Sequence, residues 1–286
     1  MEIARGDVAV ITGAGGGLGL ALARQCLARG MRLLLADVDE AALRAAAASL
    51  PAGEVALQRA DVSRAADVEA LAGRAFAGPG PVRLLFNNAG VGVARPLAET
   101  TAGDWQWVLG VNLWGVVHGV AAFLPRLEAQ PGPSRIVNTA SAAGFLSEPG
   151  LGAYAVSKHG VVVLSETLAR ELAAARSRVG ITVLCPAFFP TGIDASERVR
   201  PPELASGAPP SAAARAAQER LSHAVRSGRL GPDQIAAAAL RGVERDALHV
   251  FTHAKIRLAI EQRNAEVLAA GAWPDPAAGP AGKERA

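Results

Sequence analysis

Residues 7–19, DVAVITGAGGGLG, decide the fold of this 286-residue chain. The first six, DVAVIT, have the length and the continuous apolar character of a strand buried on both faces, as in parallel sheets. Gly13, Gly17 and Gly19 follow, and the next stretch, LGLALARQCLARG, has helical periodicity and stops at Gly30. Glycines between a strand and a helix allow a tight turn and a close approach of the backbone to a pyrophosphate, which the helix N-terminus attracts. The stretch therefore predicts a strand, a phosphate-binding loop and a helix.

The same alternation of strand and helix continues along the chain. Strand-length apolar runs occur at residues 32–37, 82–88, 135–141 and 180–185, and helical stretches such as DEAALRAAAASLP lie between them. Repeated units of strand, helix and strand form parallel sheets that are covered on both faces. We therefore predict an α/β fold, a Rossmann-type doubly wound parallel sheet, in a single domain over residues 1–270.

Composition narrows the class of protein. Half of the residues are hydrophobic, which is enough for one large core, and no uninterrupted run of 18 apolar residues or signal-peptide layout is present. Cys26 and Cys185 lie in apolar surroundings without metal-ligand spacing, so we expect reduced core residues and no metal. The formal charge is only +3 and arginines alternate with acids, which disfavours nucleic acid as a partner. We expect a soluble cytoplasmic protein that binds no membrane.

The stretch AYAVSKH at residues 153–159 contains the one tyrosine of the chain and one of its three lysines. Lys158 follows Tyr154 by four residues, which places both on one helix face. A phenol with a pKa near 10 is a poor base at neutral pH, and a nearby cation lowers that pKa. Such a pair suits proton transfer at an alcohol oxygen, with Ser141 at a strand end donating a hydrogen bond to the same oxygen. The alternative is a surface pair beside an ordinary serine.

These motifs resemble those of the short-chain dehydrogenase/reductase family. The resemblance covers residues 5–193 and extends more loosely to about residue 260. The family's glycine pattern TGxxxGxG corresponds to residues 12–19, its NNAG motif to residues 87–90, and its YxxxK motif to residues 154–158. One departure is the later proline-glycine turn, which reads Pro186-Ala187 here.

The resemblance implies a nicotinamide cofactor and a set of site residues. The implied catalytic residues are Asn112, Ser141, Tyr154 and Lys158. The implied cofactor-binding residues are Gly13, Gly17, Leu18, Gly19, Asp37, Asp61, Val62, Asn88, Ala89, Gly90, Tyr154, Lys158, Pro186 and Thr191. In the family the asparagine holds a water that links the lysine to solvent. The family commonly assembles as tetramers or dimers through the helices that carry Asn112 and Tyr154, so we expect a homo-oligomer.

Asp37 indicates which nicotinamide cofactor is bound. It ends the second predicted strand, near the position where an acidic residue holds both ribose hydroxyls. A carboxylate there repels a 2′-phosphate, and neither Val38 nor Gly16 supplies the cation that phosphate-preferring relatives carry. An aspartate that only caps a helix is the alternative. We predict NAD rather than NADP.

Residues 194–231 interrupt the alternation. This segment is rich in Pro, Ala, Ser and Gly and is longer than a connection between compact elements needs. Because it begins beside the predicted cofactor site, we predict a substrate lid, with a flexible surface loop as the alternative. The last residues, 271–286, are predicted to be a flexible tail.

Apolar residues near the lid and near Ser141 suggest the substrate. We expect substrate contacts from Ser141, Phe145, Leu151, Phe188, Phe189 and Ile193, and Leu146 is a further apolar residue of the segment after Ser141. Such a pocket disfavours small polar sugars and favours a bulky hydrophobic or aryl secondary alcohol or ketone.

Other candidates carry less weight. The five histidines lack metal spacing, and Trp105, Trp107 and Trp114 are interpreted as core or subunit-interface residues. An inactive NAD-binding regulator or scaffold is the main alternative function, because fold does not determine function. A sugar epimerase or dehydratase is disfavoured by the glycine spacing and the short C-terminal region.

Overall fold

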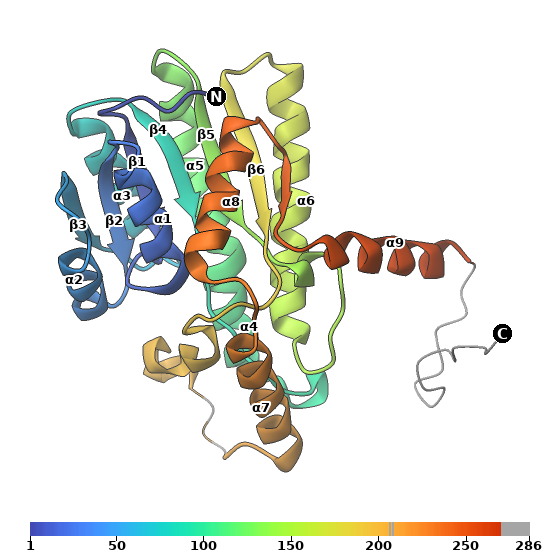
Figure 1. Cartoon of the computed structure of the whole chain (residues 1–286). Coiled ribbons are helices and arrows are strands. Elements are labelled where there is room, and N and C mark those ends of the chain that lie inside the picture. Colours follow the sequence, from blue (N-terminus) through green and yellow to red (C-terminus); the bar gives the residue numbers. More distant parts are fainter. Residues whose placement is uncertain (206, 208, 270–286) are drawn as a thin grey trace.

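A seven-stranded parallel sheet forms the centre of the protein, as the computed structural model shows for residues 1–205, 207 and 209–269. The strand order is β3-β2-β1-β4-β5-β6-β7 (Figure 1). The strands are β1 (Val8–Thr12), β2 (Arg32–Asp37), β3 (Val55–Arg59), β4 (Val82–Asn87), β5 (Ser134–Thr139), β6 (Val179–Cys185) and β7 (His249–Phe251). The predicted doubly wound fold is confirmed. The sequence interpretation missed β3 and β7, the two edge strands.

The order of the strands reverses at β1. This strand pairs with β2 through Ile11 and Leu35, and with β4 through Ile11 and Phe86. The chain leaves β1 toward one edge and returns on the other side at β4. A crevice opens at the carboxyl ends of strands where the order reverses, and this is where such sheets bind ligands.

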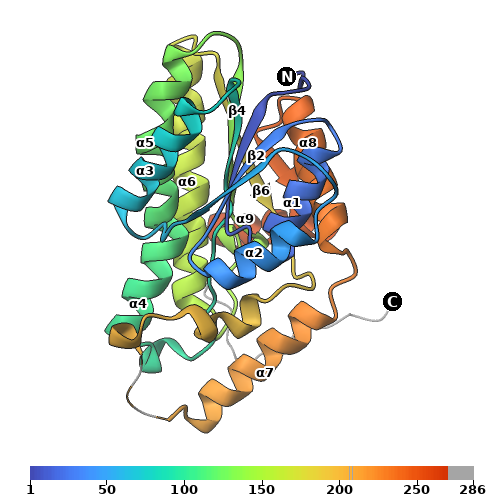
Figure 2. The same cartoon turned by 90° about the vertical axis from the view of Figure 1, so that its left-hand side faces the viewer.

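Helices cover both faces of the sheet (Figure 2). One face carries α1 (Gly17–Leu27), α2 (Glu40–Ala48) and α8 (Pro232–Glu244), and the other carries α3 (Ala65–Ala77), α5 (Gly115–Ala129) and α6 (Gly152–Ala174). Each face has its own core. Leu22, Leu43 and Ile235 are buried in the first, and Leu71 and Phe123 in the second. The helices are rich in alanine, whose small side chain lets them pack closely against both faces of the sheet.

Helix α4 (Ala102–Leu109) runs into α5 through a π-helical turn, η2 (Gly110–Trp114). By length and composition the joined helix, Ala102–Ala129, would be able to cross a membrane. It contacts α3 and α6 within the domain, and core helices of this kind have the same composition. A capping box at Thr101 and Asp104 starts α4.

The segment predicted as a lid has regular structure in its described parts. It contains η4 (Ile193–Val199), η5 (Pro202–Leu204) and α7 (Ala212–Arg226). Helix α7 lies beyond the carboxyl end of the sheet (Figures 1 and 2). Helix α9 (Ala254–Leu268) follows β7, and the predicted flexible tail, 271–286, lies outside the described residues.

Candidate active site

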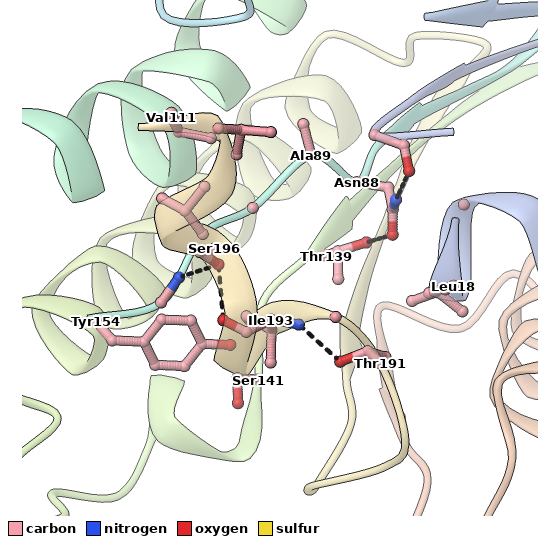
Figure 3. Close-up of a pocket in the computed structure, with 18 of the residues that line it drawn as sticks. Leu18, Asn88, Ala89, Val111, Thr139, Ser141, Tyr154, Thr191, Ile193 and Ser196 are labelled. Carbon is pink, nitrogen blue, oxygen red and sulfur yellow. Dashed lines mark hydrogen bonds between the residues drawn. The ribbon is translucent and has the colours of Figure 1, made fainter. Parts of the chain in front are cut away.

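A cavity of about 560 Å³ opens at the carboxyl ends of the strands. The glycine loop after β1 and the ends of β2, β4, β5 and β6 form its floor, and residues of η4, η5 and α7 form its opposite wall. Figure 3 shows the two sides facing each other, with Leu18 on α1 and Tyr154 on α6 at opposite ends. The predicted site residues therefore converge from elements that are far apart in the sequence.

Two positions of the glycine loop require glycine. A Cβ atom on Gly19 would lie 2.1 Å from the carbonyl oxygen of Gly13, so any side chain would push α1 away from the loop. Gly13 has a φ of +66°, and a Cβ there would lie 2.7 Å from the Cα of Ala89. Close packing therefore places the N-terminus of α1 against the cavity, where its partial positive charge attracts an anion. This geometry fits a dinucleotide.

Hydrogen bonds join the glycine loop to the end of β4. The Thr12 hydroxyl accepts from the backbone N–H of Asn88 at 3.0 Å and donates to the carbonyl of Phe86 at 3.1 Å. The Asn88 side chain donates to the carbonyl of Thr12 at 3.0 Å and accepts from Thr139 at 3.4 Å (Figure 3). The NNAG motif thus holds three strand ends in register under the cavity.

Two carboxylates lie at the end of the cavity away from Tyr154. Asp37 accepts from the backbone N–H groups of Gly15 at 2.8 Å and Asp39 at 3.0 Å, which directs its carboxylate toward the glycine loop. Asp61 accepts from the N–H and the hydroxyl of Ser63 at 2.9 and 2.7 Å. A carboxylate has about four acceptor positions, so Asp37 can accept further hydrogen bonds from the two hydroxyls of a ribose.

Lys158 lies beneath Tyr154 in the interior of the domain. Its ammonium donates to the carbonyl of Thr139 at 2.8 Å and lies 5.6 Å from the centroid of the Tyr154 ring. Only 3% of Lys158 is exposed, and this burial lowers its pKa to about 8.

The phenol of Tyr154 points toward the hydroxyl of Ser141 (Figure 3). Burial raises the pKa of Tyr154 to about 12, and hydrogen bonding with Ser141 opposes part of this rise. The sequence analysis predicts the opposite direction, a lowering by Lys158. In this structure the loss of solvent around the phenol is the largest cause of the change in pKa, and it favours the neutral phenol.

Asn112 lies behind the cavity wall rather than in it. Its carbonyl oxygen accepts from the N–H of Val91 at 2.8 Å, and its amide donates to the carbonyl of Val91 and to the hydroxyl of Ser157, both at 3.0 Å. Ser157 in turn donates to the carbonyl of Tyr154 at 2.6 Å. Asn112 therefore connects η2 to the first turn of α6. Its expected role in holding a water stays a prediction.

Comparison with known proteins identifies the family. The short chain dehydrogenase family model matches residues 7–201. The chain belongs to the short-chain dehydrogenase/reductase family. It is accordingly an oxidoreductase of that family, as the sequence motifs predict.

Similar proteins span nearly the whole chain. A CLA biosynthesis dehydrogenase/reductase of Lactiplantibacillus plantarum is 30% identical, over 95% of this chain and 96% of its own. The crystal structure of a short chain dehydrogenase/reductase from Burkholderia phymatum in complex with NAD is 46% identical with a TM-score of 0.92, and covers 96% of this chain and 99% of that one. A short-chain dehydrogenase from Sphingobium yanoikuyae in complex with NADPH is 25% identical with a TM-score of 0.71, over 94% and 98%. Family members thus bind either nicotinamide cofactor.

All the predicted cofactor residues of this short-chain dehydrogenase/reductase line the one cavity, and so do Ser141, Leu151, Phe188, Phe189 and Ile193. Phe145 does not, and its predicted substrate contact is wrong. Its ring turns away to pack against His249 and Phe251, with centroids 5.9 and 5.5 Å apart. The neighbouring Leu146 lines the cavity instead.

The sequence analysis does not assign several of the cavity residues to the site. They are Trp107 on α4 together with Ser196, Val199, Leu204, Leu221 and Val225 of the η4–α7 segment. Trp107 was interpreted as a core or interface residue. It is 3% exposed, and its packing against Val199 and Leu204 makes it part of the cavity wall. The sequence does contain a pattern that could have identified the α7 residues, because apolar side chains recur at helical spacing on one face of that helix.

A buried ion cluster joins η4 to α4. Asp104, with no exposed surface, lies 2.7 Å from the guanidinium of Arg200 and 3.2 Å from that of Arg95. The Arg200 guanidinium also lies over the Trp107 ring, 4.9 Å from its centroid. Burial tends to raise the pKa of Asp104, but hydrogen bonds from Thr101 and Arg200 and the charge of Arg95 together lower it. The base of the η4–α7 segment is therefore anchored to the domain.

Proposed function

We propose that this protein is an NAD-dependent oxidoreductase that interconverts a secondary alcohol and a ketone, most suitably a bulky hydrophobic or aryl compound. One observation carries the proposal. The hydroxyls of Tyr154 and Ser141 face each other in the same cavity that the glycine loop lines, with Lys158 buried beneath them. This arrangement serves a reaction at an alcohol oxygen beside a bound dinucleotide.

Each of the four side chains has a different role in the reaction at the substrate oxygen. A bound nicotinamide cofactor supplies the hydride acceptor or donor. Ser141 donates a hydrogen bond to the substrate oxygen and holds it next to the phenol. Tyr154 gives or takes the proton on that oxygen, and the charge of Lys158 favours the phenolate whenever the proton has left. Asn112, through Ser157, holds the turn of α6 that carries Tyr154.

The charges around the cofactor end support NAD rather than NADP. Asp37 lines the cavity and accepts from the backbone N–H groups of Gly15 and Asp39, and neither Lys158 nor Arg198, the two cations among the described lining residues, forms an ion pair with it. Arg59 is the register neighbour of Asp37 on β3, but it does not line the cavity and forms no ion pair with Asp37 in the described part of the chain. A 2′-phosphate would therefore meet a carboxylate without a cation to neutralise it.

Asp37→Ala is expected to narrow the preference for NAD over NADP by at least about tenfold, because it removes both a ribose acceptor and a negative charge. The measurement is kcat/KM with each cofactor. Asp39→Ala is the matched control, since Asp39 accepts from the N–H of Ala42 as the cap of α2 and lies outside the cavity lining. Equal efficiency with NAD and NADP in the wild type would contradict the assignment.

The substrate end of the cavity is apolar. Leu221 and Val225 of α7 pack with Leu151 in one buried cluster, and the Tyr154 ring and Ile193 pack against it. Helix α7 therefore covers the reacting end and supports the proposed lid over residues 194–231. The buried anchor at Arg200 suggests that α7, rather than η4, is the part that opens.

Leu221→Ala is expected to lower kcat/KM for bulky aryl-substituted secondary alcohols about tenfold and to leave small secondary alcohols unaffected, because it removes apolar contact on one wall. Leu258→Ala, on the exposed face of α9, is the control. A uniform change for substrates of all sizes would show that α7 does not shape the pocket. Preference of the wild type for sugars would reject the apolar pocket itself.

Exposed apolar residues support a homo-oligomer. Trp114 at the start of α5 and Val156 and Val163 on α6 are each at least 50% exposed. The turn η2, which ends at Trp114, lies beside α6, where Leu113 packs against Gly160. A second copy of the chain placed on this face would bury these side chains.

A further inference from the structure

The cavity has two cationic side chains among its described lining residues, Lys158 and Arg198. Lys158 is buried beneath Tyr154 and bonded to the carbonyl of Thr139, at the reacting end. Asp37, Asp61 and Glu148 add negative charge to the lining. A dinucleotide would bring two further negative charges on its diphosphate. Arg198 is thus the cation that remains to balance them.

Arg198 lies in η4, close to the start of α1. Its Nη1 donates to the carbonyls of Gly192 at 3.1 Å and Ala195 at 3.0 Å. A Cβ atom on Gly192 would lie 3.5 Å from this Nη1, so the guanidinium rests against that residue. The preceding residue, Thr191, lies 3.6 Å from the position of a Cβ on Gly17, the first residue of α1. The consecutive residues Thr191 and Gly192 therefore connect the N-terminus of α1 to the guanidinium of Arg198.

The guanidinium of Arg198 is positioned but not neutralised. It donates to two uncharged carbonyls, and within the described part of the chain it forms no ion pair. Arg200, two residues later, behaves differently, because it turns into the interior and pairs with Asp104. In a helix with three residues per turn, positions two apart point to different sides. The buried Arg200 thus anchors η4, and the anchor keeps Arg198 at the cavity.

We infer that Arg198 binds the diphosphate of the cofactor from the wall opposite α1, which makes the anion site two-sided. The inference rests on the proposed function, since it requires a dinucleotide in the cavity. A carboxylate on the substrate has the same anionic chemistry. The contact between Thr191 and Gly17 favours the diphosphate, because Thr191 directly precedes Gly192, against which the guanidinium rests, and Gly17 is the first residue of α1.

The test is calorimetric titration of wild type, Arg198→Gln and Arg198→Lys with NADH, ADP-ribose and adenosine. We expect Arg198→Gln to raise the Kd for NADH and ADP-ribose about tenfold, and to leave adenosine, which has no phosphate, unchanged. Arg198→Lys should retain part of the affinity as a point charge. The Kd of the wild type should also rise more steeply with salt than that of Arg198→Gln. Arg215→Gln, an exposed arginine of α7 outside the cavity lining, is the control.

The outcomes separate this inference from the proposed function. Equal Kd values for NADH in wild type and Arg198→Gln would overturn the inference and leave the proposed function standing. Unchanged NADH affinity with a raised KM only for carboxylate-bearing alcohols would also overturn it and would assign Arg198 to the substrate. A wild type that binds neither NADH nor ADP-ribose would overturn the proposed function itself. Arg198 is exposed, so the variants should unfold at the wild-type temperature.

Discussion

Tyr154→Phe should reduce turnover by at least about a hundredfold, the usual scale for loss of an acid or base, while the fold and the affinity for NADH remain. The substitution removes one oxygen and keeps the ring that packs against Leu151, Leu221 and Val225. The proton on the substrate oxygen then has no side chain to accept or donate it. Steady-state kinetics with the best alcohol or ketone of a screen, beside NADH titration, measures both quantities.

The single tyrosine of the chain allows a second measurement. Tyrosinate absorbance in a pH titration reports Tyr154 alone. In the cofactor-free protein, burial raises this pKa to about 12, so tyrosinate should form only in strong alkali. Binding of NAD adds a positive charge near the phenol and should lower the midpoint. Near wild-type turnover in Tyr154→Phe would refute the mechanism and would leave the NAD-binding scaffold as the better reading.

Asp104→Ala should destabilise the protein by about 3–5 kcal/mol, the range for removing one partner of a buried ion pair. The substitution leaves the guanidinium of Arg200, 3% exposed, and that of Arg95, 17% exposed, without their carboxylate. It also removes the acceptor for the N–H and the hydroxyl of Thr101 at the start of α4. Urea unfolding at pH 7 gives the free energy of unfolding.

Two variants sharpen the measurement. Glu69→Ala removes a carboxylate from an exposed pair with Arg126 and should change the stability far less. Arg200→Met in the Asp104→Ala background should recover part of the loss, because an apolar side chain replaces the unpaired charge. A loss below about 1 kcal/mol in Asp104→Ala would mean that the cluster is not the anchor of η4.

The contribution of Asp104 should also depend on pH. Its pKa is lower in the folded protein than in the unfolded chain, where an aspartate has a pKa of about 3.9. A group with a lowered folded pKa stabilises the fold above its unfolded pKa, and the contribution is lost as the pH falls through the folded pKa. The stability difference between wild type and Asp104→Ala should therefore be full at pH 7 and shrink in acid below about pH 4.

The sequence predicts the five central strands of the sheet but not its two edge strands. The five central strands have continuous apolar runs because both of their faces are buried, as in β1, where every residue is buried. The edge strand β3 is only partly buried and contains Gln58 and Arg59, and β7 is three residues long. Neither has the run that identifies a buried strand. Edge strands need less apolar surface, and so their local signal is weak.

Phe145 shows how a residue close in sequence to the site can lie outside it. The interpretation assumed that apolar residues following Ser141 face the same cavity. The short 3₁₀ turn after Ser141, η3 (Ala142–Gly144), sends the Phe145 ring to the edge strand β7 and leaves Leu146 on the cavity side. The direction of a side chain in a turn depends on dihedral angles that residue types alone do not specify.

The sequence by itself determined the α/β class, the family, and the residues of the cofactor loop and of the Tyr154–Lys158 pair. These features depend on local constraints, namely the room that a glycine leaves, the burial of a strand and the four-residue repeat of a helix face. Only the tertiary structure decided that Asp104 pairs with Arg200, that Trp107 and Leu221 line the cavity, and that burial raises the pKa of Tyr154. Each of these depends on contacts between segments far apart in the chain, and on the loss of water that those contacts cause.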